Sequence, residues 1–247
     1  MGKWWVCSWI GVVWILAAIS PVSAEGLFLR DNLQSARVGD YLVISANKTQ
    51  TLLHISAKQG EVLTIEEIAV PENKKSSRMS WKEWVRRGSP GNTSWVIFDL
   101  ELHSGKMLRY YSFTKKSWLE IPDADNFLCK LLSLKFNKIP DAARKRVGPK
   151  PISGPEWRPF WQPRMVVEGQ PISGVVFDAW HARWPQDGSE LSGKSIEVYL
   201  PHDSIRYPAY FPYWLQINGV AGKAKIRIID SGSHLESPAA VVPGMNA

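Results

Sequence analysis

Short stretches in which every second residue is apolar recur along the chain from Asp40 onward. The first three are DYLVIS (40–45), TQTLLHIS (49–56) and EVLTIEEIAV (61–70), and only the short segments ANK (46–48) and AKQG (57–60) separate them. Alternation with a period of two is typical of half-buried β-strands, and connections this short join antiparallel neighbours. The segment 40–70 therefore predicts a three-stranded antiparallel meander.

The same alternation continues to the end of the chain. SWVIFDLELH and KMLRYYSF predict a hairpin across Ser104 and Gly105. Later strands are predicted from RMVVE, GVVFDAWHARW, KSIEVYL, YWLQIN and KAKIRII. In KSIEVYL the alternation predicts that Ile196, Val198 and Leu200 face inward.

Only two segments have the pattern of a helix. In SWKEWVRRG (80–88), Ser80 and Glu83 form a capping box, and DADNFLCKLLSLKF (123–136) has apolar residues at helical spacing. Helices do not alternate regularly with strands, which argues against a doubly wound parallel sheet. We therefore expect an α+β fold, a mainly antiparallel curved sheet or half-barrel with one or two packed helices.

The first 24 residues have the composition of a secretory signal peptide. A short basic start is followed by the apolar run Trp4–Ile19 and by the small residues Val22-Ser23-Ala24. The apolar run is shorter than the ~20 residues that span a bilayer as a helix. We expect cleavage before Glu25 and export to the periplasm or beyond, and a retained membrane anchor is the alternative.

Charge and cysteine content restrict the partners. The formal net charge of +7 suits anionic or amphipathic partners, and we expect lipid, glycan or another envelope or host protein. Nucleic acid is not expected, and membrane contact would be only peripheral. Because Cys7 lies in the signal peptide, Cys129 has no partner for a disulfide. The sequence has no HExxH, paired-cysteine or phosphate-loop motif, so we predict no metal and no cofactor.

A proline-rich segment divides the mature chain. Residues 148–163 contain five prolines, which favours an extended, semi-rigid connector. This connector would separate a β-rich half (25–147) from a second β-rich half (164–232), with a disordered tail at 233–247. A long crossover within a single sheet would give the same pattern.

Several stretches resemble an uncharacterised family of secreted proteins from chlamydia-like intracellular bacteria. The resemblance lies in LLHISAKQGEVLTIEEIAVP, FTKKSWLEIPDADNFLCKLLSL, WQPRMVVEGQPISGVVFDAWHARWPQDGSELSGKSIEVYLP and YPAYFPYWLQINGVAGKAKIRIIDSG. It covers most of the mature chain. It implies export, and it implies no particular activity.

The segment KIRIIDSGSH contains the first candidate for catalysis. IIDSG resembles the active-site motif of retroviral-type aspartic proteases, and strand alternation predicts that Asp230 lies on the same face as Ile226 and Ile228. Such enzymes need two carboxylates that share a proton, and the sequence has no second Asp-Ser-Gly or Asp-Thr-Gly. Asp, Ser and Gly also form turns, so the alternative is that the motif ends a strand.

Asp99 and Glu101 are the second candidate for catalysis. They are two residues apart on one predicted strand, so their Cα atoms would lie about 6.7 Å apart on one face. Carboxyl groups of inverting glycosidases stand about 6.5–9.5 Å apart. The alternative is that both carboxylates belong to the solvated face of an amphipathic strand.

Aromatic and basic residues suggest a binding surface. The candidates for ligand binding are Trp157, Arg158, Trp161, Arg164, Trp180, Trp184, Tyr213 and Trp214. Rings combined with guanidinium groups bind sugars and lipid headgroups, but they equally pin irregular loops onto a sheet. We therefore predict an exported, non-enzymatic binding or envelope-associated protein. The alternatives are a carboxylate-dependent hydrolase that uses Asp230, or Asp99 with Glu101, and a structural or host-interaction module.

Overall fold

The computed structural model describes residues 26–119, 127–204, 206–208, 210–219 and 222–239. The predicted signal peptide (1–24) lies outside these residues. The strands are β1 (Gly26–Phe28), β2 (Tyr41–Ala46), β3 (Thr49–Gln59), β4 (Val62–Pro71), β5 (Ser94–Glu101), β6 (Met107–Ser112), β7 (Ser117–Trp118), β8 (Lys135–Lys138), β9 (Met165–Val167), β10 (Gln170–Ile172), β11 (Phe177–Arg183), β12 (Ser195–Pro201), β13 (Trp214–Gly219) and β14 (Gly222–Gly232). The helices are α1 (Leu29–Leu33), α2 (Trp81–Arg86), α3 (Phe127–Ser133) and the 3-10 helix η1 (Asp141–Ala143).

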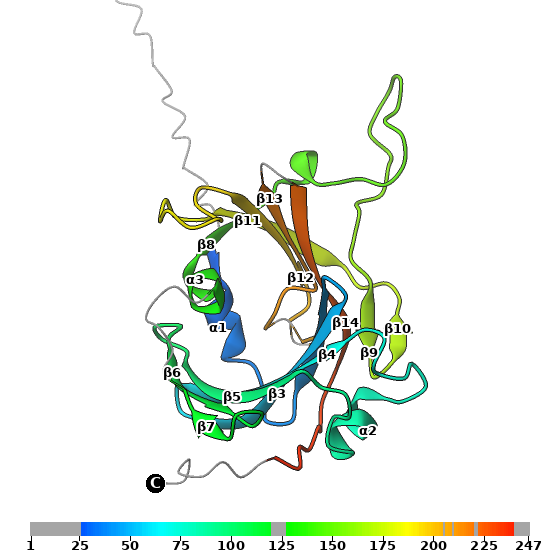
Figure 1. Cartoon of the computed structure of the whole chain (residues 1–247). Coiled ribbons are helices and arrows are strands. Elements are labelled where there is room, and N and C mark those ends of the chain that lie inside the picture. The colour runs from blue at the N-terminus through cyan, green and yellow to red at the C-terminus, as the bar shows by residue number, and fades with distance from the viewer. Residues whose placement is uncertain (1–25, 120–126, 205, 209, 220–221, 240–247) are drawn as a thin grey trace, which may run out of the picture.

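Twelve strands form a single sheet in the order β1-β8-β11-β12-β13-β14-β2-β3-β4-β5-β6-β7, and β9 and β10 form a separate hairpin. The sheet is strongly curved, and α1 and α3 lie on its concave side (Figure 1). Neighbouring strands pair in antiparallel fashion, including the predicted meander β2-β3-β4 and the hairpin β5-β6. The predicted α+β class, a mainly antiparallel curved sheet with a few packed helices, is confirmed.

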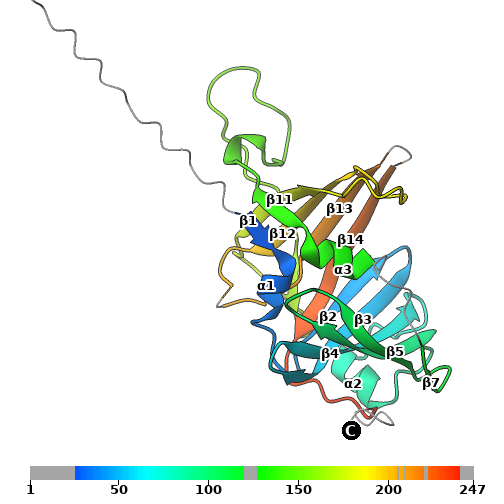
Figure 2. The same cartoon turned by 90° about the vertical axis from the view of Figure 1, so that its left-hand side faces the viewer.

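The segments before and after the proline-rich connector share this sheet. Strands β2–β7 form one meander and β11–β14 form another, and β14 pairs with β2 to join them (Figure 2). At the other edge, β8 pairs with β1 on one side and with β11 on the other. The connector is therefore a long crossover within one sheet.

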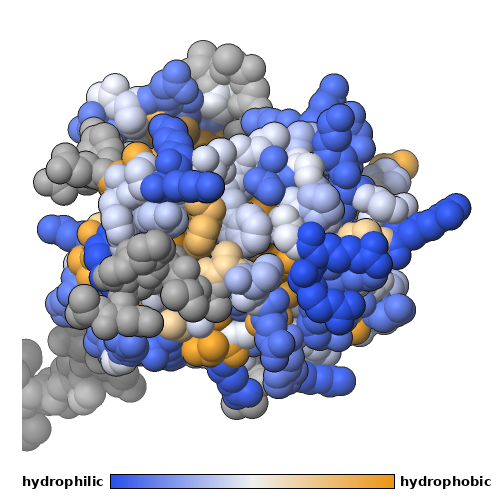
Figure 3. Space-filling model, turned by 60° about the horizontal axis from the view of Figure 1, so that its bottom comes forward, coloured by the Kyte–Doolittle hydropathy of each residue, from blue (hydrophilic) through white to orange (hydrophobic). Residues whose placement is uncertain are grey.

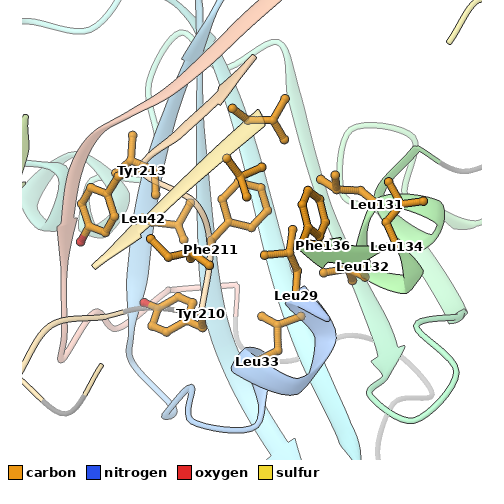
Figure 4. Packing of buried hydrophobic residues seen from close by; sticks show 14 of the residues in the cluster. Leu29, Leu33, Leu42, Leu131, Leu132, Leu134, Phe136, Tyr210, Phe211 and Tyr213 are labelled. Atoms are coloured by element: carbon orange, nitrogen blue, oxygen red, sulfur yellow. The ribbon is translucent and has the colours of Figure 1, made fainter. Parts of the chain in front are cut away.

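The concave face of the sheet encloses the main hydrophobic core. Figure 4 shows Leu29 and Leu33 of α1, Leu132 of α3 and Phe136 of β8 converging on this space. Phe211, from the loop before β13, is buried among them. Burial of this apolar surface at about 25 cal/mol per Å² stabilises the curved sheet around its two short helices.

The convex face of β2–β5 carries a second core. Trp81, Trp84 and Val85 of α2 are buried against this face. The N-terminus of α2 is capped as predicted, because the Ser80 hydroxyl oxygen accepts a hydrogen bond from the Glu83 N–H.

Two segments differ from the sequence predictions. Residues 233–239, predicted as part of a disordered tail, pack against the second core, where Leu235 is buried and its N–H donates to the Gly39 carbonyl. The rest of that tail (240–247) lies outside the described residues. The helix predicted at 123–136 ends at Ser133, and residues 135–138 form strand β8. Pairing with β1 and β11 and full burial of Phe136 override the local helical pattern.

Candidate functional site

Asp230 lies next to an irregularity in β14. The register of β14 on β2 shifts between Ile228, which faces Ile44, and Asp230, which faces Val43, so Ile229 is an extra residue. Such a β-bulge disrupts the alternation of side chains along the strand. The prediction that Asp230 shares the inner face with Ile228 is therefore wrong, because Asp230 lies on the convex side with Val43.

The Asp230 carboxylate is buried and held by protein groups. Its Oδ1 accepts a hydrogen bond from the Gly169 N–H at 3.0 Å, and the Tyr41 hydroxyl donates to the same carboxylate. Burial raises the pKa of Asp230. The neighbouring acid, Glu168, forms an ion pair with Lys82 that lowers the pKa of Glu168. The Glu168 carboxylate is thus paired with Lys82.

The other two residues of the motif also have structural contacts. The Ser231 hydroxyl donates to the Val166 carbonyl at 3.0 Å and lies 3.0 Å from the Tyr213 hydroxyl. A Cβ at Gly232 would lie only 2.6 Å from the Tyr41 ring, so this position requires glycine. Asp-Ser-Gly therefore fastens the β9–β10 hairpin and Tyr41 to the strand that joins the two meanders.

Asp99 and Glu101 have separate partners. Asp99 is 3% exposed and accepts hydrogen bonds from the Thr64 hydroxyl at 2.8 Å and from Arg109 Nε at 2.7 Å. Glu101 accepts from the Ser104 hydroxyl in the β5–β6 turn. Asp99 is therefore a buried carboxylate on the convex face, paired with an Arg109 side chain that is partly exposed.

Three of the predicted ligand-binding aromatics are core residues. Trp180, Trp184 and Tyr213 are each less than 10% exposed. Trp184 stacks on Phe127 of α3 with ring centroids 5.6 Å apart, and burial is the main cause that raises the pKa of Tyr213 to about 12. These rings fill the interior and offer no surface to a ligand.

Two other candidates meet on the convex face of β12 and β13. Trp161, at the end of the connector, contacts both Trp214 and Tyr199 edge-on, with centroid distances of 5.0 Å. Lys145 lies 6.0 Å from the Trp161 ring centre and forms an ion pair with Glu197 at 2.7 Å. The connector is thus pinned to the sheet by aromatic rings. Tyr199 is buried beneath this cover.

The remaining candidates lie on or beside residues 145–160, which we call the projecting loop. In Figures 1 and 2 this segment extends away from the body of the protein between η1 and β9. Trp157 is 70% exposed, and Arg164 is exposed just beyond the loop. Arg158 is tied down instead, by an ion pair with Glu156 at 2.7 Å and a hydrogen bond from its Nη1 to the Gly148 carbonyl.

Sequence reasoning missed two further exposed apolar side chains on this loop. Ile152 is fully exposed and Val147 is 50% exposed. One feature of the sequence indicates that Ile152 is exposed. It lies in the proline-rich segment, where no partner strand is available to cover its side chain.

A small apolar recess lies on the concave side, among the described residues. Its volume is about 20 Å³, and Leu42, Leu100, Leu132 and Phe211 are among the residues that line it. This is room for about one water molecule. A ligand larger than a water molecule would therefore have to displace neighbouring side chains, such as Leu132 or Phe211, to enter this recess.

Neither clustered metal ligands nor a membrane-spanning helix is found among the described residues. No three His, Cys, Asp or Glu side chains in this part of the chain gather in a group that could hold a metal ion. Among the same residues, no helix is long and apolar enough to cross a bilayer.

A protein-family model described as "CT021 protein" matches residues 51–173 of the chain. The chain resembles the CT021 family. The solved 2.0 Å structure of the hypothetical protein CT021 from Chlamydia trachomatis has a similar fold, with a TM-score of 0.62 and 19% sequence identity over 88% of this chain and 98% of that one. No curated protein matches the chain. The predicted resemblance to an uncharacterised chlamydial family is confirmed, and the CT021 match includes the projecting loop.

Proposed function

We propose that the chain is an exported, non-enzymatic binding protein that attaches to an anionic lipid surface through the projecting loop. The observation that carries this proposal is the exposure of Ile152 and Trp157 on a loop whose base is rigid and basic. The candidate carboxylates Asp230 and Asp99 are buried and occupied by protein partners, which favours binding over hydrolysis.

The base of the loop is held in a defined conformation. The guanidinium groups of Arg144 and Arg146 each lie 4.2 Å from the Phe160 ring centre. The Val147 N–H donates to the Pro159 carbonyl at 3.0 Å, which ties the two arms of the loop together. Because these contacts order the base, little conformational entropy is lost when the tip binds a surface.

The tip has the composition of a membrane-interface anchor. Tryptophan concentrates where a bilayer meets water, and an isolated aliphatic side chain gains free energy when it enters the acyl boundary. The face at the bottom of Figure 1, which is brought forward in Figure 3, is mostly hydrophilic and has only small separate hydrophobic patches. Single exposed apolar side chains are normal on any protein, but Ile152 and Trp157 lie on one segment that extends outward.

Charge around the loop complements an anionic surface. Residues 144–164 contain one acidic residue and six basic ones, Arg144, Lys145, Arg146, Lys150, Arg158 and Arg164. Lys150 and Arg164 are exposed, and basic residues near an anionic leaflet contribute about 1 kcal/mol each. Charge attraction and apolar insertion together would give reversible, peripheral attachment.

Vesicle co-sedimentation tests the proposal. Mature protein should bind vesicles that contain phosphatidylglycerol, should bind phosphatidylcholine vesicles much less, and should lose binding as salt increases. Ile152→Ser with Trp157→Ser should weaken binding more than tenfold, because each removed side chain contributes roughly 1.5 kcal/mol or more of transfer free energy.

Leu108→Ser is the matched control, because Leu108 is 52% exposed on β6. This variant should bind the anionic vesicles as tightly as the wild type. Absence of wild-type binding, or equal binding by the double variant, would overturn the proposal. Binding that ignores lipid charge would also contradict it and would point to a protein partner.

A further inference from the structure

A buried His–Glu pair lies on the convex face of β3 and β4. His54 is 3% exposed, Glu66 is 1% exposed, and the two residues are opposite each other across the strands. His54 Nδ1 lies 2.8 Å from Glu66 Oε2. The other carboxylate oxygen accepts from Trp95 Nε1 at 2.7 Å and from the Ser237 hydroxyl at 2.6 Å.

These contacts determine the role of each nitrogen of His54. An ionised carboxylate only accepts hydrogen bonds, so the proton between the two residues is on Nδ1. Nε2 is the nitrogen that remains, and it is buried without a hydrogen-bond partner. An unpartnered buried polar atom costs about 1–3 kcal/mol, so a nearby ligand group that satisfied it would be favoured.

His54 and Glu66 both line a cavity of about 210 Å³ beneath the C-terminal segment. Val38, Ile97 and Leu235 provide apolar walls. Figures 1 and 2 place this end of the chain away from the projecting loop. The cavity is therefore a separate feature, and its role does not depend on the function proposed for the loop.

We infer that this cavity binds a small, uncharged, mainly apolar molecule that carries one hydroxyl group, which hydrogen-bonds to His54 Nε2. A hydroxyl group can donate to Nε2 when the imidazole is neutral and accept from it when the imidazole is protonated. None of the residues that line the cavity is Lys or Arg, while Glu66 and Glu236 are acidic, so an anionic ligand is repelled.

A cationic ligand is also disfavoured. The Glu66 oxygens already accept three hydrogen bonds from the protein, which leaves a cation little direct contact. Most of the exposed lining surface is apolar, and a few polar side chains interrupt it. Such a lining is typical of a site that takes an amphipathic small molecule.

A titration with three molecules of similar shape tests the inference. Cyclohexanol should shift the His54 Nε2 resonance of the full mature protein in a saturable way and leave the resonances of exposed His181 unchanged. Cyclohexylammonium and cyclohexanecarboxylate should not compete with it. His54→Phe should weaken cyclohexanol binding about tenfold, because it removes the hydrogen-bonding nitrogen.

His181→Phe, a change of the same kind at an exposed site on β11, should bind cyclohexanol like the wild type. If His54→Phe does not fold, the response of the His54 Nε2 resonance in the wild-type protein still tests the inference. The inference is overturned by an unmoved His54 signal, by tighter binding of either charged analogue, or by unchanged affinity in a folded His54→Phe variant. Vesicle binding should not change in any of these variants, so failure here is distinguishable from failure of the loop proposal.

Discussion

The convex face of the sheet is covered in two different ways. Over β2–β5 the cover is helix α2 together with residues 233–239, and it buries tryptophan rings as well as polar groups such as Glu66. Over β12 and β13 the cover is the proline-rich connector, whose Trp161 ring contacts Tyr199 and Trp214. Proline cannot donate the backbone hydrogen bonds of an added strand, so ring packing holds the connector. The first cover buries the second hydrophobic core. The second cover holds only part of the connector, and the projecting loop extends away from the body of the protein.

Truncation of Trp84 in the first cover should have the largest effect on stability. Trp84 is 1% exposed, and its Nε1 donates to the Pro90 carbonyl at 3.1 Å. Trp84→Ala should lower the free energy of unfolding by about 3–5 kcal/mol, because it leaves a large cavity and an unpaired carbonyl. Urea titration measures the change. Arg86→Ala, on the exposed side of the same helix, is the control, and its free energy of unfolding should stay within about 0.5 kcal/mol of the wild type. If both variants lost the same free energy of unfolding, burial of Trp84 would not explain the effect.

Truncation of Trp161 in the second cover should cost less. Its ring is half-buried and contacts Trp214 and Tyr199. Trp161→Ala should lower the unfolding free energy by about 1–3 kcal/mol and should change the near-UV circular dichroism of the remaining rings. Trp157→Ala, in the same connector but exposed, serves as the control and should change stability by less than about 0.5 kcal/mol. A loss as large as that of Trp84→Ala would remove the distinction between the two covers.

Asp230, on the strand that joins the meanders, should have the smallest effect and one that depends on pH. Because burial raises its pKa in the folded state, its contribution to stability is fully present below the ordinary aspartate pKa of about 3.9 and is lost as the pH rises through the folded value. Asp230→Asn keeps an oxygen to accept from the Gly169 N–H and does not titrate. The stability of this variant relative to the wild type should therefore increase between about pH 3 and about pH 7, as measured by urea titration at each pH. A relative stability that decreases over this interval would show that the carboxylate is stabilised by its surroundings.

Local patterns in the sequence predicted most of the strands. The alternation in 40–70 and the capping box at Ser80 are local signals, and both segments form as expected. The pairing of β14 with β2 could not be predicted from local patterns, because it depends on the arrangement of all the strands.

Two β-bulges explain much of what could not be predicted about the candidate sites. Near its turn, the β3–β4 hairpin pairs Lys58 with Leu63, a register that would place His54 opposite Glu67. The register shift after Ile55 moves His54 opposite Glu66 instead. A second bulge at Ile229 moves Asp230 to the convex face. A single inserted residue decides which side chains meet, and no periodic pattern reveals it.

The position of β14 also determines the order in which the chain can fold. A ribosome makes β14 after the other strands, yet β14 lies between β13 and β2 near the middle of the sheet. Until Gly232 has been made, β2–β7 and β11–β13 are two unjoined meanders, and the edge of β2 stays open to pairing with other chains. Contacts between residues so distant in sequence slow folding. The twelve-stranded sheet can therefore be completed only near the end of synthesis.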